Sequence, residues 1–299
     1  MMHLSGLHLL LTYQCNLECD HCFVWGSPWQ SGTMTLGMVR HILQEAQDLG
    51  TVTSIAIEGG EPFLYYPIML AAARGASAMG FEVSLVSNAY WATEVEDAVE
   101  WLRPLAGHVS SVPVSSDLYH WGEQQARRAA VARQAAEEVG ISAGVLRIAQ
   151  PESVDAARVV GELPPGESGV MYRGRAAEKL VDRATPQPWE QFVACPHEDL
   201  ASPGRVHVDP FGHLHVCQGI SIGNLIEVPL RQICAGYDPG AHPIVGPLLE
   251  GGPAALVRRY HLPHGERYAD ACHLCYEARL ALRERFPATL APDQMYGVP

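Results

Sequence analysis

The amino-acid sequence predicts an α/β fold built on a parallel sheet, followed by a smaller α+β module. From residue 7 to residue 172, short apolar runs alternate with longer helical patterns, as they do in βαβ units. After about residue 184 this alternation stops, and Pro, Gly and His become more frequent. We therefore expect one domain over residues 1–184 and a second over residues 185–299.

The first domain is expected to contain six strands and five helices. The segment TLGMVRHILQEAQDLG predicts a helix, because Thr35 can cap its start, apolar residues recur at three-and-four spacing and Gly50 ends it. In the second domain, RVHVDPFGHLHVC (205–217) predicts a hairpin whose turn is DPFG. The strands of the first domain are expected at 7–12, 53–58, 81–87, 109–115, 141–149 and 169–172, and its helices near 35–49, 67–79, 93–104, 121–139 and 151–160.

The composition limits the partners and the compartment. The formal charge of −13 argues against nucleic acid as the main partner, since phosphate binding needs a positive surface. No segment approaches the roughly 18 continuous apolar residues of a membrane span. LHLLLTY (7–13) lacks a basic leader and a cleavage site, so we expect a cytoplasmic protein. In reducing cytosol, eight cysteines indicate metal binding or catalysis more often than disulfides.

Three cysteines, Cys15, Cys19 and Cys22, follow the first predicted strand in the segment CNLECDHC. Because ligands bind at the carboxyl ends of the strands of a parallel sheet, this loop is expected at the functional edge. A disulfide uses two thiols, and a structural zinc ion prefers four ligands. A four-iron cluster takes one thiolate per iron, so three thiolates leave one iron open to a small chelating molecule.

The spacing C-x3-C-x2-C at the end of a first strand resembles the signature of the radical S-adenosylmethionine (radical SAM) superfamily. The resemblance covers residues 7–180 and implies a partial (β/α)6 barrel, TIM-like and open on one side. It also implies a 4Fe–4S cluster on the three thiolates, with S-adenosylmethionine on the open iron. One electron from that cluster would split the sulfonium into methionine and a 5′-deoxyadenosyl radical, which removes a hydrogen atom from the substrate.

Further segments match the places where that superfamily holds S-adenosylmethionine. In EGGEP (58–62), two glycines allow the backbone to approach a ligand, and a carboxylate can accept hydrogen bonds from an ammonium group. Asp117 suits the ribose diol, although it could instead cap the next helix. Arg147 could meet the methionine carboxylate or simply lie on the surface. The resemblance implies contacts from Gly59, Gly60, Glu61, Pro62, Ser87, Asn88, Ser115, Asp117 and Arg147, with His21 and Phe23 placed against the adenine.

A second set of cysteines lies in the C-terminal domain. A cysteine at the end of a hairpin and a distant C-x2-C pair predict a four-thiolate site, for zinc or for an iron–sulfur cluster. The pattern resembles the Twitch domain, a short relative of the SPASM domain, although the stretch from Cys195 to Gly212 is one residue longer than usual. The resemblance implies an auxiliary 4Fe–4S cluster, with zinc as the alternative, and its ligands would be Cys195, Cys217, Cys272 and Cys275. Cys234 lies in an apolar helical pattern and is expected to be buried.

The resemblance implies a radical SAM enzyme that abstracts a hydrogen atom from a peptide or a small molecule. The outcome would be a net oxidation or a peptide modification, assisted by the auxiliary cluster and by a reductase or flavodoxin-type electron donor. The triplet begins at residue 15, so we expect no peptide-recognition domain before it. The alternative is a non-catalytic iron–sulfur or zinc-binding scaffold or sensor, which would not need the GGEP segment or the polar strand ends.

Overall fold

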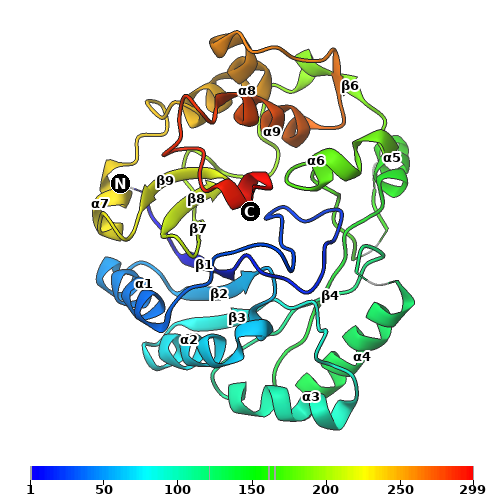
Figure 1. The fold of residues 1–299 in the computed structure, drawn as a ribbon, viewed down its shortest axis with the longest axis vertical. Helices are drawn as coiled ribbons and strands as arrows, with labels where there is room; N and C mark the ends of the chain where they lie inside the picture. Colours follow the sequence, from blue (N-terminus) through cyan, green and yellow to red (C-terminus); the bar gives the residue numbers. More distant parts are fainter. Residues whose placement is uncertain (1, 121, 161, 165, 299) are drawn as a thin grey trace.

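A six-stranded sheet with the order β3-β2-β1-β7-β8-β9 forms the centre of the computed structural model (Figure 1). The model describes residues 2–120, 122–160, 162–164 and 166–298. β1 is parallel to both of its neighbours, β2 and β7, and β2 is parallel to β3. The strands are β1 Gly6–Thr12, β2 Ser54–Gly59, β3 Glu82–Leu85, β7 Arg205–Val208, β8 His213–Cys217 and β9 Ile220–Asn224.

Beyond β3 the sheet continues as a looser parallel array. β4 (Val114–Ser115) and β5 (Val145–Leu146) pair in parallel, and isolated parallel bridges join Ser84 to Ser111 and Ile148 to Ser168. Pro113 has no N–H group, which explains why only two residues of the predicted strand 109–115 form a ladder. The arrangement is an α/β partial barrel, as predicted.

The strand predicted at 169–172 is wrong. The chain makes one bridge at Ser168 and then leaves the sheet. The backbone N–H of Tyr172 donates instead to the carboxylate of Asp270 (3.3 Å), and the N–H of Arg173 donates to the Met171 carbonyl (2.8 Å). The hydrogen bond from Tyr172 to Asp270, the N-cap of α9, therefore holds this segment against the C-terminal helices.

The helices of the barrel agree with the predicted ranges to within about two residues at each end. As predicted, Thr35 caps the start of α1 by accepting a hydrogen bond from the Met38 N–H, and Gly50 ends this helix with φ of +78°. The helix predicted from residue 121 is described from Glu123, because Trp121 lies outside the described residues. The barrel helices are α1 Leu36–Leu49, α2 Tyr66–Ala78, α3 Val95–Leu102, α4 Glu123–Glu138, α5 Pro151–Val160 and α6 Ala176–Lys179; three more follow, α7 Leu230–Gly236, α8 Val245–Tyr260 and α9 Ala271–Leu282.

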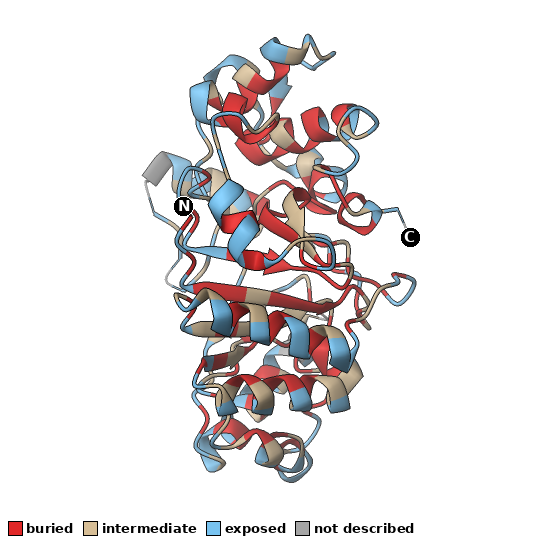
Figure 2. Cartoon of the chain, turned by 90° about the vertical axis from the view of Figure 1, so that its left-hand side faces the viewer, coloured by how far each residue is buried: buried red, intermediate tan, exposed pale blue. Residues whose placement is uncertain are grey.

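The predicted hairpin at 205–217 is confirmed and extends the barrel sheet. His207 lies opposite His215 in the antiparallel pair β7–β8, and His207 also lies opposite His8 of β1. One apolar core runs from the barrel into the hairpin and α7–α9. Figure 2 shows the buried residues gathered on the strands and on the inner faces of the helices. The C-terminal cysteines are therefore carried on a structure that is continuous with β1.

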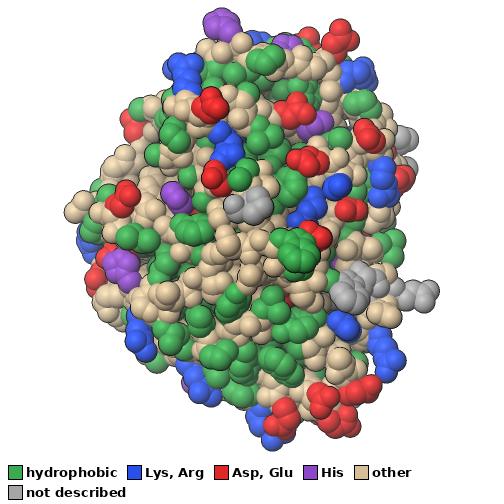
Figure 3. Space-filling model, in the orientation of Figure 1, with side chains coloured by type: hydrophobic (Ala, Val, Ile, Leu, Met, Phe, Trp, Pro, Cys, Tyr) green, Lys and Arg blue, Asp and Glu red, His purple; other side chains and the backbone are tan. Residues whose placement is uncertain are grey.

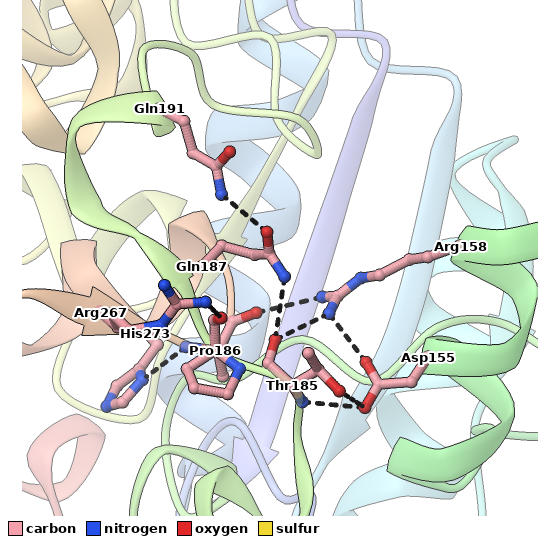
Figure 4. Close-up of polar contacts among 9 residues, drawn as sticks. Asp155, Arg158, Thr185, Pro186, Gln187, Gln191, Arg267 and His273 are labelled. Atoms are coloured by element: carbon pink, nitrogen blue, oxygen red, sulfur yellow. Dashed lines mark hydrogen bonds and ion pairs between the residues drawn. The ribbon is translucent and has the colours of Figure 1, made fainter.

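A polar network connects α5 to the C-terminal segments (Figure 4). Arg158 donates to Asp155 Oδ1 (2.8 Å) and to the carbonyl oxygens of Thr185 (3.2 Å) and Ala269 (3.1 Å). Asp155 Oδ2 accepts hydrogen bonds from the backbone N–H and the hydroxyl of Thr185. Because Ala269 directly precedes Asp270, the N-cap of α9, this network sets α9 against the barrel.

The surface carries both signs of charge. On the face shown in Figure 3, Lys and Arg side chains lie scattered among acidic ones and form no basic patch. In the part of the chain that the structure describes, no helix is long and apolar enough to cross a lipid bilayer.

Candidate functional site

The loop that follows β1 brings Cys15, Cys19 and Cys22 to one cavity of about 260 Å³. All three are free thiols, and the first two are only 8% exposed. Backbone N–H groups point at two of the sulfurs: Leu17 donates to Cys15 Sγ (3.4 Å) and Gly26 donates to Cys22 Sγ (3.2 Å). The loop therefore places three sulfurs around one cavity, and backbone N–H groups already donate hydrogen bonds to two of them.

The thiols are poised to accept a cation. Burial raises the pKa of Cys15 to about 12, and the charge of Glu61 adds to this rise. Burial also raises the pKa of Cys19, with further contributions from Cys22 and Cys15. Thiols in such a setting lose their protons only when a positive centre binds beside them, because metal ligation requires the thiolate form.

The two glycines of the GGEP segment allow β2 to lie against the cysteine loop. A Cβ at Gly60 would stand 2.1 Å from the Gln14 carbonyl oxygen, and one at Gly59 would stand 2.4 Å from that of Thr12. A backbone hydrogen bond holds the two segments together, since the Gly60 N–H donates to the Thr12 carbonyl (2.7 Å). Both glycines line the cavity, and they also hold the backbone that carries Cys15.

Glu61 is fully buried and holds neighbouring loops together. Its Oε1 accepts from the Phe63 N–H (3.0 Å) and the Ser87 hydroxyl (3.0 Å), and its Oε2 accepts from the Asn88 N–H (2.7 Å). Burial raises the pKa of Glu61 to about 7 despite these bonds. Neither Glu61 nor the buried Pro62 lines the cavity, so the structure gives them a supporting position behind it.

The end of β3 contributes Ser87 and Asn88, and both line the cavity. The Asn88 side-chain amide donates to Asn16 Oδ1 (2.9 Å) and lies 3.6 Å from Cys15 Sγ. Asn88 therefore connects the third strand to the first cysteine.

After β4, Asp117 lies in the cavity wall beside Ser115, His21 and Phe23. Its carboxylate accepts from His120 Nδ1 (2.7 Å) and from the Tyr119 and Ile148 N–H groups. Burial would raise the pKa of Asp117, but the hydrogen bond from His120 and the nearby His21 ring, with Nε2 at 3.6 Å from Oδ2, hold it below its usual range. The helix-capping alternative is wrong, because Gly122 is the N-cap of α4 and no described side chain caps that helix.

Arg147 is not brought to the cavity. Its side chain is exposed, whereas its neighbours Leu146 and Ile148 line the cavity. Alternate side chains of an extended segment point to opposite faces, which places Arg147 on the outside. The predicted contact with a methionine carboxylate has no support in this geometry.

Arg175 contacts the cysteine loop although it is not among the residues predicted to hold the cofactors. Its guanidinium donates to the carbonyl oxygens of Cys19 (2.9 Å) and Gly26 (2.8 Å), and its backbone N–H donates to the Cys22 carbonyl (2.9 Å). Gly174 has φ of +59°, and a Cβ there would stand 2.6 Å from the Cys22 carbonyl oxygen. The segment Arg173–Arg175 therefore encloses the cysteine loop, and its partners there lie about 150 residues earlier in the chain.

The four C-terminal cysteines line a second cavity together with two buried arginines. Cys217 ends β8, and Cys272 and Cys275 lie three residues apart on one side of α9. Arg173 Nη1 donates to Cys217 Sγ (3.1 Å), and Arg279 donates to the Gln218 carbonyl. The residues lining this cavity include Cys195, Cys217, Cys272, Cys275, Arg173 and Arg279.

A third cavity, of about 720 Å³, adjoins both cysteine sites. Arg173 lines all three cavities. Glu58 and Met171 are shared with the first cavity, and His197 is shared with the second. The third cavity, called the interior cavity below, therefore borders both thiol sites.

Comparison with known proteins agrees with this arrangement. Residues 9–119 match the family model of the Radical SAM superfamily. The chain is 26% identical over 120 residues to "Putative peptide biosynthesis protein YydG" of Bacillus subtilis (strain 168), which covers 40% of this chain and 38% of that protein. It is 32% identical over 82 residues to the "S-adenosylmethionine-dependent nucleotide dehydratase" of Selenomonas ruminantium, which covers 27% of this chain and 29% of that protein. Both matches span less than half of the relative.

Among solved structures, the chain resembles Streptococcus suis SuiB bound to S-adenosylmethionine, with a TM-score of 0.53 at 14% identity. The likeness covers 81% of this chain and 68% of that one. At this identity it is a likeness of fold, and it agrees with the partial barrel described above.

Proposed function

We propose that this chain is an enzyme that reductively cleaves S-adenosylmethionine, since residues 9–119 match the family model of the Radical SAM superfamily. The observation that carries the proposal is the convergence of Cys15, Cys19 and Cys22 on a cavity whose wall includes polar residues from the ends of three successive strands. When bound to the three thiolates, a 4Fe–4S cluster supplies the electron for that cleavage.

The residues present fit a cluster better than a single zinc ion. Four ligands at 2.3 Å around one zinc ion place their sulfurs about 3.8 Å apart. Among the described residues, these three thiols do not form a group whose ligand atoms all lie within 4.8 Å of one another. The N–H groups of Leu17 and Gly26 donate to Cys15 Sγ and Cys22 Sγ, as N–H groups do to ligating sulfurs.

The polar wall fits S-adenosylmethionine. Asp117 keeps a negative charge at neutral pH, and its bonds to His120, Tyr119 and Ile148 fix its position, so its carboxylate can accept from ribose hydroxyls. Phe23 supplies an apolar face for the adenine, with the His21 ring in the same wall. Gly59, Gly60, Ser87, Asn88 and Ser115 supply further backbone and side-chain polar groups, while Glu61 holds these loops in register.

The second thiol set fits an auxiliary 4Fe–4S cluster. No three of the described thiols in this set have all their sulfurs within 4.8 Å, a spacing wider than around one zinc ion, whereas Cys272 lies within 4.8 Å of ligand atoms of His197 and Asp270, which keeps zinc as the alternative. Arg173 and Arg279 supply positive charge beside the four thiols, and the Arg173 guanidinium donates to one of them. A centre with four protein ligands has no open position, so its role would be to take up an electron and not to bind substrate.

The interior cavity is the proposed substrate site, because it adjoins both centres. A peptide is the first candidate substrate, since the chain is similar in part to a protein named for peptide biosynthesis. A small molecule is the second candidate, since the other similar protein is named a nucleotide dehydratase. All eight cysteines are free, as suits a reducing compartment, and a flavodoxin-type reductase there would serve as the electron donor.

Anaerobic reconstitution tests the proposal. Iron and sulfide should load about eight irons per chain, and S-adenosylmethionine with dithionite should then give 5′-deoxyadenosine. The triple variant Cys15→Ala/Cys19→Ala/Cys22→Ala should lose that product and about half of the iron. Cys234→Ala is the matched control, because Cys234 is buried in α7 and lines neither thiol cavity. If the wild-type protein loads iron but never yields 5′-deoxyadenosine, the result favours the non-catalytic scaffold or sensor. If about four irons and one zinc are bound per chain, the C-terminal thiols hold zinc and not an auxiliary cluster.

A further inference from the structure

Three titratable side chains, none of them a cysteine, meet where β2, β1 and β7 lie side by side, and one of them, Glu58, also lines the first cysteine cavity. His8 of β1 lies directly opposite His207 of β7, and Glu58 of β2 lies opposite Leu10, two residues further along β1. Because side chains alternate along a strand, His8 and position 10 share a face. The three ligand atoms lie within 4.8 Å of one another, with Glu58 Oε1 at 2.9 Å from His207 Nε2 and 3.3 Å from His8 Nδ1.

The protonation states suit a cation. Burial would raise the pKa of Glu58, but the hydrogen bonds from His207 and His8 hold it well below its usual range, so the carboxylate is charged. Burial lowers the pKa of His207, which favours a neutral imidazole at neutral pH, and a metal on Nε2 would require the proton donated to Glu58 to move to Nδ1. In the described part of the chain, the two histidines are the only hydrogen-bond donors recorded for the Glu58 carboxylate.

Glu58 differs in this respect from the acid of a comparable cluster. Asp117 lies between His21 and His120, and both of its carboxylate oxygens already accept hydrogen bonds from backbone N–H groups, those of Tyr119 and Ile148. Glu58 has no backbone donor in the described residues, which leaves its second oxygen available. All three side chains of the Glu58 cluster also line the interior cavity of about 720 Å³.

We propose that His8, Glu58 and His207 form a binding site for one divalent transition-metal ion of the zinc or ferrous class. Two imidazoles and one carboxylate on one side of an ion are a donor set that such metals accept, and they leave further coordination positions open. Those positions face the interior cavity, so the ion would hold an oxygen or nitrogen atom of whatever molecule enters it. The site rests on these three residues alone and does not depend on the proposed function.

Cobalt(II) is the probe, since it replaces zinc and reports its ligands by absorption. The full chain, with its cysteines first loaded with iron and sulfide, should bind one cobalt per chain without sulfur-to-cobalt charge transfer. Glu58→Gln and His207→Asn should each weaken this binding at least about tenfold and leave the iron content unchanged. His213→Asn is the matched control, because His213 lies on the neighbouring strand β8 and its ring does not line the interior cavity.

The outcomes separate this site from the cysteine sites. If the cysteines failed to load iron, cobalt on them would show intense sulfur charge transfer, which would count against the proposed function and not against this site. Iron content and thermal unfolding of each variant distinguish a lost ligand from a lost fold. A wild-type chain that binds no cobalt outside its thiols, or variants that bind it as tightly as wild type, would overturn the metal site and leave a hydrogen-bonded triad.

Discussion

The guanidinium of Arg173 lies against the sulfur of Cys217, with Nη1 at 3.1 Å from Sγ. The same guanidinium lies 5.8 Å from the ring centroid of Phe23, next to Cys22, and Arg173 lines the first cavity as well as the second. Burial would lower the pKa of Arg173, but the neighbouring Cys217, Cys272 and Glu198 raise it. One buried positive charge is therefore placed between the two thiol sets.

Replacing Arg173 should make the proposed auxiliary cluster harder to reduce. Without the positive charge, the more negative reduced state loses stabilisation, so Arg173→Gln should lower its midpoint potential. A shift on the order of 60 mV corresponds to tenfold in a one-electron equilibrium. Redox titration followed by EPR measures it. Arg205→Gln is the control, since Arg205 pairs with the same Glu198 (3.5 Å) but is half-exposed and contacts no cysteine; equal potentials in both variants would contradict the electrostatic role.

Gly60→Ala should damage the first cysteine site. A Cβ 2.1 Å from the Gln14 carbonyl cannot be accommodated without moving the loop that carries Cys15. We expect a loss of several kcal/mol of stability and of the iron at that site, measured by urea unfolding and by iron analysis. Gly37→Ala should instead stabilise α1 by up to about 1 kcal/mol, because a Cβ there meets only the Thr35 hydroxyl at 3.7 Å. An iron content of Gly60→Ala equal to that of Gly37→Ala would refute this.

Arg175→Ala should loosen the cysteine loop. The substitution leaves the buried carbonyl groups of Cys19 and Gly26 without their donor, at a cost of about 1–3 kcal/mol each. The variant should lose iron faster to a chelator than wild type does. Arg183→Ala removes an exposed arginine bonded to Glu152 and should change the chelation rate little. Equal rates of iron loss in the two variants would show that Arg175 does not hold the cysteine loop in place.

The stability of the cluster-free chain should depend on pH through Glu61. Its pKa of about 7 exceeds the ordinary value of 4.5, so the folded chain holds this proton more tightly than the unfolded chain does. The associated stability is fully present below pH 4.5 and is lost as the pH rises through 7, and it amounts to about 3 kcal/mol. Urea unfolding at pH 5 and at pH 8 should show this loss in wild type and in the exposed-site control Glu94→Gln, but not in Glu61→Gln.

Binding of S-adenosylmethionine should distinguish Asp117 from Arg147. Asp117→Asn removes a charged acceptor from the cavity wall and should weaken binding to the loaded protein by tenfold or more, as expected for a charge-assisted hydrogen bond. Arg147→Ala should leave the affinity within about twofold, because this exposed side chain lies outside the cavity. Equilibrium dialysis of both variants gives the answer, and a strong effect at Arg147 would restore the contact that the sequence predicted.

Local patterns were enough to predict much of this protein. The cysteine spacing, the GGEP glycines, the α1 caps and the hairpin at 205–217 depend on residues close together in the chain, where chemistry and backbone geometry can be read directly. The strand at 169–172 could not be read in this way, because the hydrogen-bond partner of Tyr172 is Asp270, almost a hundred residues later.

The sequence by itself predicted which thiols group together and which strand end carries the first set, since thiol number and spacing are local properties. Only the tertiary structure decided that Arg173 and Arg175 enclose the cysteine loop and that Arg147 faces outward. It alone placed His8, Glu58 and His207 together, because β7 pairs beside β1 although about 200 residues separate them in the chain. Pairing across such a distance is decided by the packing of the whole sheet, and no short segment encodes it.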